Sequence, residues 1–255
     1  MKKFKYIFGA FLLAGSVASC NFLDREPMDF GDENAYYKTV DDLELAVNDF
    51  YQILPKMEYL WGGPYEDDNT SDNQCGNWPN NMFYPGDKKT VQQANSEWKF
   101  VNLRGINFFI NKTKEQMDAG AITGTKEFID HYWGEGFFFR AYEHFRLLRN
   151  YGDAPILEVM LPDDEATLAQ ASKRRPRNEV ARFIIEDLKR AEELMMENAP
   201  AEGRLSKDAA RLLRARVALY EATWEKYHAN TAFVPGNPKW VGASMYPDFQ
   251  FKAGD

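Results

Sequence analysis

Apolar residues recur at helical spacing along most of this 255-residue chain, and no stretch has a convincing strand pattern. The clearest case is residues 126–150, where Phe128, Tyr132 and Phe139 follow one another at steps of four and seven. Such a stripe forms one face of an amphipathic helix. We therefore predict an all-α fold of antiparallel helical hairpins, packed like tetratricopeptide (TPR) units and joined by long irregular loops. The expected helices cover residues 32–54, 96–117, 126–150, 178–196 and 206–228, with Asn178 and Ser206 as caps and Val101, Phe139, Trp224 and Tyr227 on apolar faces.

The first 19 residues have the pattern of a secretory signal peptide. Lys2, Lys3 and Lys5 precede a short apolar core at residues 7–14, and small residues follow it. The last four residues of this pattern, Val17-Ala18-Ser19-Cys20, resemble the lipobox of bacterial lipoproteins. That resemblance implies cleavage before Cys20 and acylation of Cys20, which would anchor the chain in a membrane. Residues 20–31 are polar, contain Pro27 and read as a tether.

Charge and cysteine content narrow the function classes. The leader contributes only its three lysines to the charge, so removing it changes the formal net charge from −8 to −11. An acidic chain without a basic tract argues against a nucleic-acid partner and suits neutral ligands. Once Cys20 carries lipid, Cys75 is the one cysteine left, and an internal disulfide cannot form.

Residues 58–95 are the candidate ligand-binding segment. Turn signals and many Asn and Asp residues alternate there with aromatic residues, and long irregular segments of this kind are often functional. Sugar rings stack on aromatic side chains, while their hydroxyls bind amides and carboxylates. We expect Trp61, Trp78, Asn80 and Tyr84 to bind ligand. The alternative is that these side chains pin the long loop to the helical core.

The same segment contains oxygen ligands for a cation, but their spacing is not that of an EF-hand. Calcium takes six to eight oxygen ligands, and an EF-hand places a glycine and a distal glutamate at fixed positions that are missing here. No His-Glu-x-x-His zinc motif, Gly-x-Ser-x-Gly elbow or phosphate loop occurs in the sequence. We expect no cofactor and no enzymatic activity, and we interpret the acidic stretch as a solvated loop. The residues considered for calcium are Asp67, Asp68, Asn69, Asp72 and Asn73.

Several blocks together resemble the SusD/RagB family of outer-membrane nutrient-binding lipoproteins. They are Cys20-Asn21-Phe22-Leu23-Asp24-Arg25-Glu26-Pro27, Arg140-Ala141-Tyr142 with Tyr151-Gly152-Asp153-Ala154-Pro155, Arg177 with Glu179-Val180, and Gly203-Arg204-Leu205-Ser206-Lys207. The resemblance implies a surface-facing lipoprotein of the outer membrane that captures glycans and passes them to a SusC-type TonB-dependent transporter. Peptide capture, or a transporter lid without a ligand site, are the alternatives. We interpret Arg140, Tyr151 and Asp153 as structural residues of this block.

Family members are usually about twice as long as this chain. The resemblance therefore implies that residues 32–255 form the helical N-terminal domain of a SusD-like protein, truncated at its C-terminus.

Overall fold

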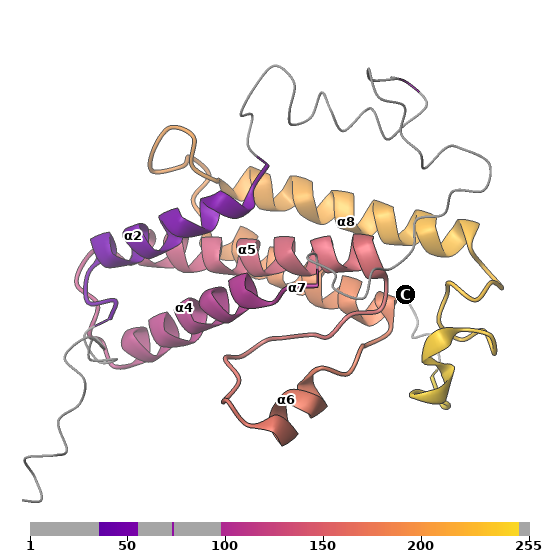
Figure 1. Ribbon diagram of the computed structural model, residues 1–255. Coiled ribbons are helices and arrows are strands. Elements are labelled where there is room, and N and C mark those ends of the chain that lie inside the picture. Colours follow the sequence, from indigo (N-terminus) through magenta and orange to yellow (C-terminus); the bar gives the residue numbers. More distant parts are fainter. Residues whose placement is uncertain (1–35, 56–72, 74–97, 250–255) are drawn as a thin grey trace, which may run out of the picture. The chain divides into compact units, whose positions relative to one another are not determined.

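The centre of the fold is one long helix, α5 (Lys126–Tyr151), which is buried on nearly every side. The computed structural model describes residues 36–55, 73 and 98–249. Within them α5 packs against α2 (Val40–Phe50), α4 (Val101–Asp118) and α7 (Arg177–Leu194) (Figure 1). The aromatic stripe of α5 predicted one buried face, and Phe139 is fully buried. Burial extends further around the helix than the stripe indicated, and it includes charged side chains such as Glu135 and Arg140.

Two glycines allow neighbouring helices to approach α5 closely. A Cβ atom at Gly136 would lie 2.9 Å from Cδ1 of Phe109 on α4. A Cβ atom at Gly134 would lie 2.8 Å from Cγ of Met195, directly after α7. Glycine is unfavourable inside a helix, so these two positions give up local stability to bring α4 and α7 closer to α5.

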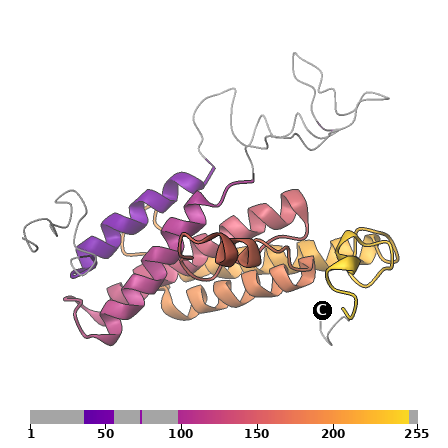
Figure 2. The same ribbon diagram turned by 60° about the horizontal axis from the view of Figure 1, so that its bottom comes forward.

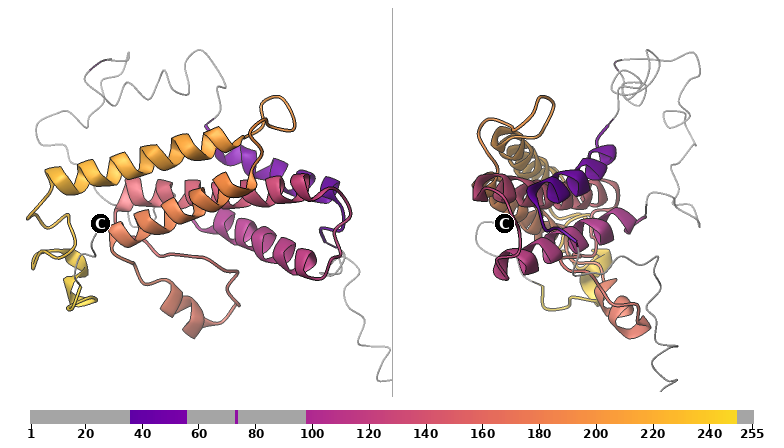
Figure 3. Two further views of the ribbon diagram at one scale, coloured as in Figure 1. Left: turned by 180° about the vertical axis from the view of Figure 1, so that it is seen from behind. Right: turned by 90° about the vertical axis from the view of Figure 1, so that its left-hand side faces the viewer.

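The remaining helices form a layer outside this core. Helix α8 (Lys207–Tyr227) packs mainly against α7, as the view from behind shows (Figure 3), and the ring of its Tyr220 also contacts Phe145 of α5, with centroids 5.5 Å apart. The pairs α4–α5 and α7–α8 are the two antiparallel hairpins predicted from the sequence. The described residues contain no strand, and none of their helices is long and apolar enough to cross a membrane. From Tyr37 onward they belong to one compact unit.

Three helix starts differ from the prediction. Helix α2 begins at Val40, because Thr39 and Asp42 form a capping box there. Helix α4 begins at Val101, five residues later than expected. The N-cap of α7 is Pro176, so Asn178 lies inside the helix, where it is buried. Ser206 is the N-cap of α8, as expected, although its side chain accepts no capping hydrogen bond.

Three side chains and one helix also differ from expectation. Val101 and Tyr227, placed on apolar faces by their spacing, are 73% and 76% exposed. Trp224 is only partly buried, and the guanidinium of Arg177 covers one face of its ring, 4.2 Å from the ring centre. The short helix α6 (Glu165–Ala171) was not predicted, and it begins where the side chain of Asp164 accepts a hydrogen bond from Thr167 N.

A buried carboxylate ties four segments of the fold together. Glu135 on α5 accepts hydrogen bonds from the hydroxyl of Tyr51 (3.0 Å), from His131 Nε2 (2.9 Å) and from Arg204 Nε (3.0 Å). Arg204 precedes α8 and reaches on to Glu44 of α2 (3.1 Å). The arginine of the Gly-Arg-Leu-Ser-Lys block is therefore a structural crosslink between the second hairpin and α2.

Candidate functional site

The site is built around a strap, residues 154–175, that leaves the end of α5 and returns at the start of α7. Its ends meet in a single antiparallel bridge, in which Arg175 N donates to the carbonyl of Ala154 (2.9 Å). The strap carries α6 and lies over one side of the helical core (Figure 2). An extended chain directs successive side chains to opposite sides. Accordingly, Pro155, Leu157 and Val159 line one hollow, while Ile156 and Glu158 line another.

Buried polar groups of α4 and α5 hold the strap in place. Asn107 donates through Nδ2 to the carbonyls of Leu157 (3.0 Å) and Val159 (3.3 Å). Arg140 donates through Nη1 to the carbonyl of Glu158 (2.7 Å). Three consecutive carbonyls of the strap are thus bound by the core, which fixes both hollows in position.

Arg140 is itself oriented by a buried ion pair. Its Nε and Nη2 donate to the two carboxylate oxygens of Asp187 on α7, at 2.6 and 2.8 Å. Both side chains are almost completely buried, and such a pair is stable only when all of its donors and acceptors are satisfied. This agrees with our interpretation of Arg140 as structural.

His144 completes the anchor, and its environment fixes its protonation state. Nδ1 lies 2.8 Å from the carbonyl of Arg140, which can only accept, so Nδ1 carries the proton. Nε2 then accepts from Leu157 N (3.1 Å). Burial lowers the pKa of His144 to about 4, and the positive charge of Arg140 acts in the same direction. The imidazole is therefore neutral when the strap is in place.

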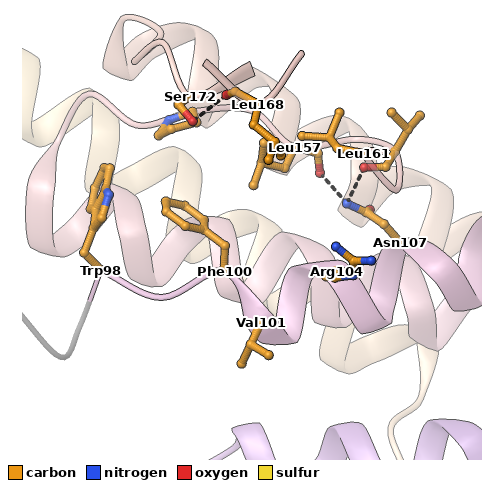
Figure 4. Close-up of a pocket in the computed structure, with 11 residues that line it drawn as sticks. Trp98, Phe100, Val101, Arg104, Asn107, Leu157, Leu161, Leu168 and Ser172 are labelled. Atoms are coloured by element: carbon orange, nitrogen blue, oxygen red, sulfur yellow. Dashed lines mark hydrogen bonds between the residues drawn. The ribbon is translucent and has the colours of Figure 1, made fainter. Parts of the chain in front are cut away.

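The first hollow lies between the strap and the start of α4 and has a volume of about 280 Å³. Figure 4 shows Trp98, Phe100 and Arg104 on the α4 side and Leu157 and Leu168 on the strap side. Its surface is mostly apolar. The full lining is Trp98, Phe100, Val101, Arg104, Asn107, Pro155, Leu157, Val159, Leu161, Leu168 and Ser172.

The second hollow, on the other side of the strap, is larger and more polar. It has a volume of about 740 Å³ and combines the rings of Phe183 and Tyr246 with charged and amide side chains. The hydroxyl of Tyr246 donates to the carbonyl of Arg174 (2.8 Å), which fixes the ring at the edge of the hollow. The full lining is Ile156, Glu158, Gln170, Ala171, Lys173, Arg175, Phe183, Met245 and Tyr246.

Asp153 positions the wall that carries Tyr246. One carboxylate oxygen accepts from Arg177 N (3.0 Å) and the other from Trp240 Nε1 (2.8 Å). Trp240 in turn stacks on Tyr246, with ring centroids 6.2 Å apart. Burial raises the pKa of Asp153, while these hydrogen bonds oppose the rise. Gly152, directly before it, has a φ of 71°, which ends α5 and turns the chain into the strap.

The structure does not test the site residues expected from the sequence. Trp61, Trp78, Asn80 and Tyr84 lie outside the described residues, as does Cys20. Of the residues considered for calcium, only Asn73 is described. Within the described part of the chain, no three His, Cys, Asp or Glu side chains are grouped so that they could hold a metal ion.

Comparison with known proteins finds relatives that are SusD-like proteins. The chain is 26% identical to the SusD-like protein P2 of Formosa agariphila, over 98% of this chain and 49% of that protein. A SusD-like protein from Bacteroides fragilis superimposes with a TM-score of 0.53 at 22% identity, covering 79% of this chain and 39% of that one. A SusD superfamily protein from Bacteroides vulgatus gives a TM-score of 0.51 at 22% identity, over 85% and 50%. The chain thus spans about half the length of the relatives it matches.

These structural likenesses support the all-α, TPR-like fold predicted from the sequence. A family model described as starch-binding and associating with the outer membrane matches residues 21–219. That match covers the described helices α2 to α7 and most of α8. The chain therefore belongs to the SusD-like family.

Proposed function

We propose that this protein is a surface-exposed lipoprotein that binds glycans and delivers them to a SusC-type TonB-dependent transporter of the outer membrane. The observation that carries the proposal is the family match over residues 21–219, a family described as starch-binding and associating with the outer membrane. The leader ending at Cys20 supports the membrane location. The role is binding and transfer, and not cleavage of the glycan.

Two regions are the candidate glycan contacts. The first is the segment with Trp61, Trp78, Asn80 and Tyr84, which remains a prediction from the sequence. The second is the larger hollow. A sugar has apolar C–H faces and polar hydroxyls, and this hollow offers aromatic rings beside Glu158, Gln170 and Lys173. A site of this composition suits a short oligosaccharide better than the apolar hollow does.

Affinity electrophoresis of the full chain in gels containing different polysaccharides tests the proposal. A retarding polysaccharide identifies the ligand, and the variants Trp61→Ala, Trp78→Ala and Tyr246→Ala then locate the contacts. Loss of one stacking ring is expected to weaken binding by roughly threefold to tenfold. The matched control is Phe233→Ala, which removes an aromatic ring that is 63% exposed and lines neither hollow.

The outcomes separate the two regions. If only the tryptophan variants lose retardation while their melting temperatures are unchanged, the loop is the contact region. If only Tyr246→Ala loses it, the contact is the larger hollow. Retardation by no polysaccharide in the panel would contradict glycan binding. An assay for new reducing ends on the retarding polysaccharide is expected to show no release.

The anchor and the transporter require a separate test in the native organism. Cys20→Ala is expected to leave an uncleaved, unlipidated precursor that no longer fractionates with the outer membrane. Affinity purification of the lipidated chain is expected to recover a TonB-dependent barrel. Normal membrane fractionation of the variant would contradict the anchor, and purification without a barrel would contradict the partnership.

A further inference from the structure

The first hollow, between the strap and the start of α4, is an apolar surface that is open to solvent. Val101, Val159 and Leu168 border it and are 73%, 51% and 37% exposed. Apolar side chains that are grouped in a concave surface are candidates for ligand contacts. Sugar binding does not account for this hollow, because a glycan hydroxyl would find few polar partners on its walls.

One side chain gives the hollow a charge. Arg104 lies on the wall formed by α4 (Figure 4), and its guanidinium has no hydrogen-bond or ion-pair partner among residues 36–55, 73 and 98–249. The other polar side chains of the wall are engaged. Asn107 donates to two strap carbonyls, and the hydroxyl of Ser172 donates to the carbonyl of Leu168 (2.6 Å). An anion placed in the hollow would therefore meet one available cation and no carboxylate of the lining.

Hydrogen bonds from the helical core fix the walls of this hollow. The bonds from Asn107 and Arg140 to three consecutive strap carbonyls hold the apolar residues of the strap opposite α4. A volume of about 280 Å³ is near the lower end of the range for small-molecule sites, and it is too small for a folded partner to enter. Preformed, concave and apolar walls with a single polar group are typical of sites for small ligands.

We propose that this hollow binds a small amphiphilic carboxylic acid. Its apolar body packs between the start of α4 and the strap, and its carboxylate pairs with the guanidinium of Arg104. The guanidinium offers two parallel donors that match the geometry of a carboxylate. No residue that lines this hollow is among the proposed glycan contacts, so the two proposals can fail independently.

Calorimetric titration with octanoate and with octanol tests the pairing. The full chain should carry Cys20→Ala, so that no acyl group of its own competes. Octanoate is expected to bind with one site per chain, about tenfold more tightly than octanol, as one charged hydrogen-bonded pair at a partly exposed site would give. Arg104→Gln should remove this preference and leave octanol binding unchanged. Arg216→Gln is the matched control, because Arg216 is an exposed arginine on α8.

A second variant tests the apolar wall. Val159→Asp places a carboxylate at the edge of the hollow and should weaken octanoate binding more than octanol binding. Val241→Asp, at a valine that is 82% exposed and lines no part of this hollow, should change neither. Polysaccharide retardation should be the same in Arg104→Gln as in the parent chain.

Three results would overturn the proposal. The first is the absence of saturable octanoate binding at millimolar concentrations. The second is octanoate affinity that Arg104→Gln does not change. The third is tighter binding of a short acetylated peptide with a C-terminal leucine than of octanoate, because the hollow would then recognise a peptide carboxylate rather than a free acid.

Discussion

The clearest consequence of the strap anchor is a loss of stability at mildly acidic pH that depends on His144. In the fold His144 must be neutral, since Nδ1–H donates to the Arg140 carbonyl and Nε2 accepts from Leu157 N. Burial lowers the pKa of this imidazole to about 4. In the unfolded chain the same group titrates near its ordinary value of about 6.5.

The direction and size of the effect follow from these two values. Between them the unfolded chain binds more protons than the fold does, so stability rises with pH. The stabilisation is fully present above about pH 6.5 and is lost progressively as the pH falls toward about 4. From about pH 7.5 to about pH 5, His144 should lower the free energy of unfolding by about 2 kcal/mol.

Urea denaturation of the full chain and of His144→Gln at these two pH values measures the effect. Glutamine can donate and accept hydrogen bonds but does not titrate, and every other ionisable group is common to both proteins. The parent chain should therefore lose about 2 kcal/mol more than the variant on acidification. Parallel pH profiles for the two proteins would refute the argument, because they would mean that His144 titrates similarly in the folded and unfolded states.

Three further outcomes test the packing. Arg140→Met should destabilise the fold by about 3–5 kcal/mol, because it leaves the Asp187 carboxylate buried without its partner. The double variant Arg140→Met with Asp187→Leu should lose less free energy of unfolding than the two single variants lose together, and additive losses in urea denaturation would contradict this. Gly152→Ala should cost about 1–2 kcal/mol, because the φ of 71° is strained for alanine, and an unchanged melting temperature would show that the turn relaxes. Phe139→Ala should cost about 3–5 kcal/mol, against a small change for the exposed Phe233→Ala, and equal losses would disprove the core assignment.

The helical hairpins could be predicted because their signal is local. The stripe on α5 and the residues Val180, Ile184 and Leu188 on α7 identify buried faces by spacing alone. The α7 residues and Tyr132 and Phe139 of the stripe are buried, while Phe128 near the start of α5 is half-buried. Where the helical spacing of a residue disagrees with its tertiary environment, the environment decides whether the side chain is buried. Val101 continues the period of α4, but it occupies the open rim of the first hollow and is exposed.

The two hollows could not be predicted, because they depend on contacts between distant residues. Pro155, Leu157 and Val159 alternate with Ile156 and Glu158, a pattern that is visible in the sequence. Nothing local shows, however, that Asn107, 50 residues before Leu157, binds the strap. Helix α6 was missed because seven residues are too few for a clear period. The loop residues predicted to bind ligand remain a prediction, since they lie outside the described part of the chain.

The crosslink made by Arg204 has a consequence for the order in which the chain folds during synthesis. Glu44 and Arg204 are 160 residues apart, so α2 is synthesised roughly 8 to 32 s before its arginine partner. Glu135 precedes Arg204 by 69 residues, so in the last part of that interval it lacks its guanidinium partner, and docking of α2 onto α5 would leave a buried carboxylate without its countercharge. Docking α2 onto α5 early closes the long loop between them, and it gains little while the ion pair between Arg204 and Glu135 is still missing. Helix α2 should therefore dock last, only after the second hairpin has formed, and until then its apolar face stays outside the core.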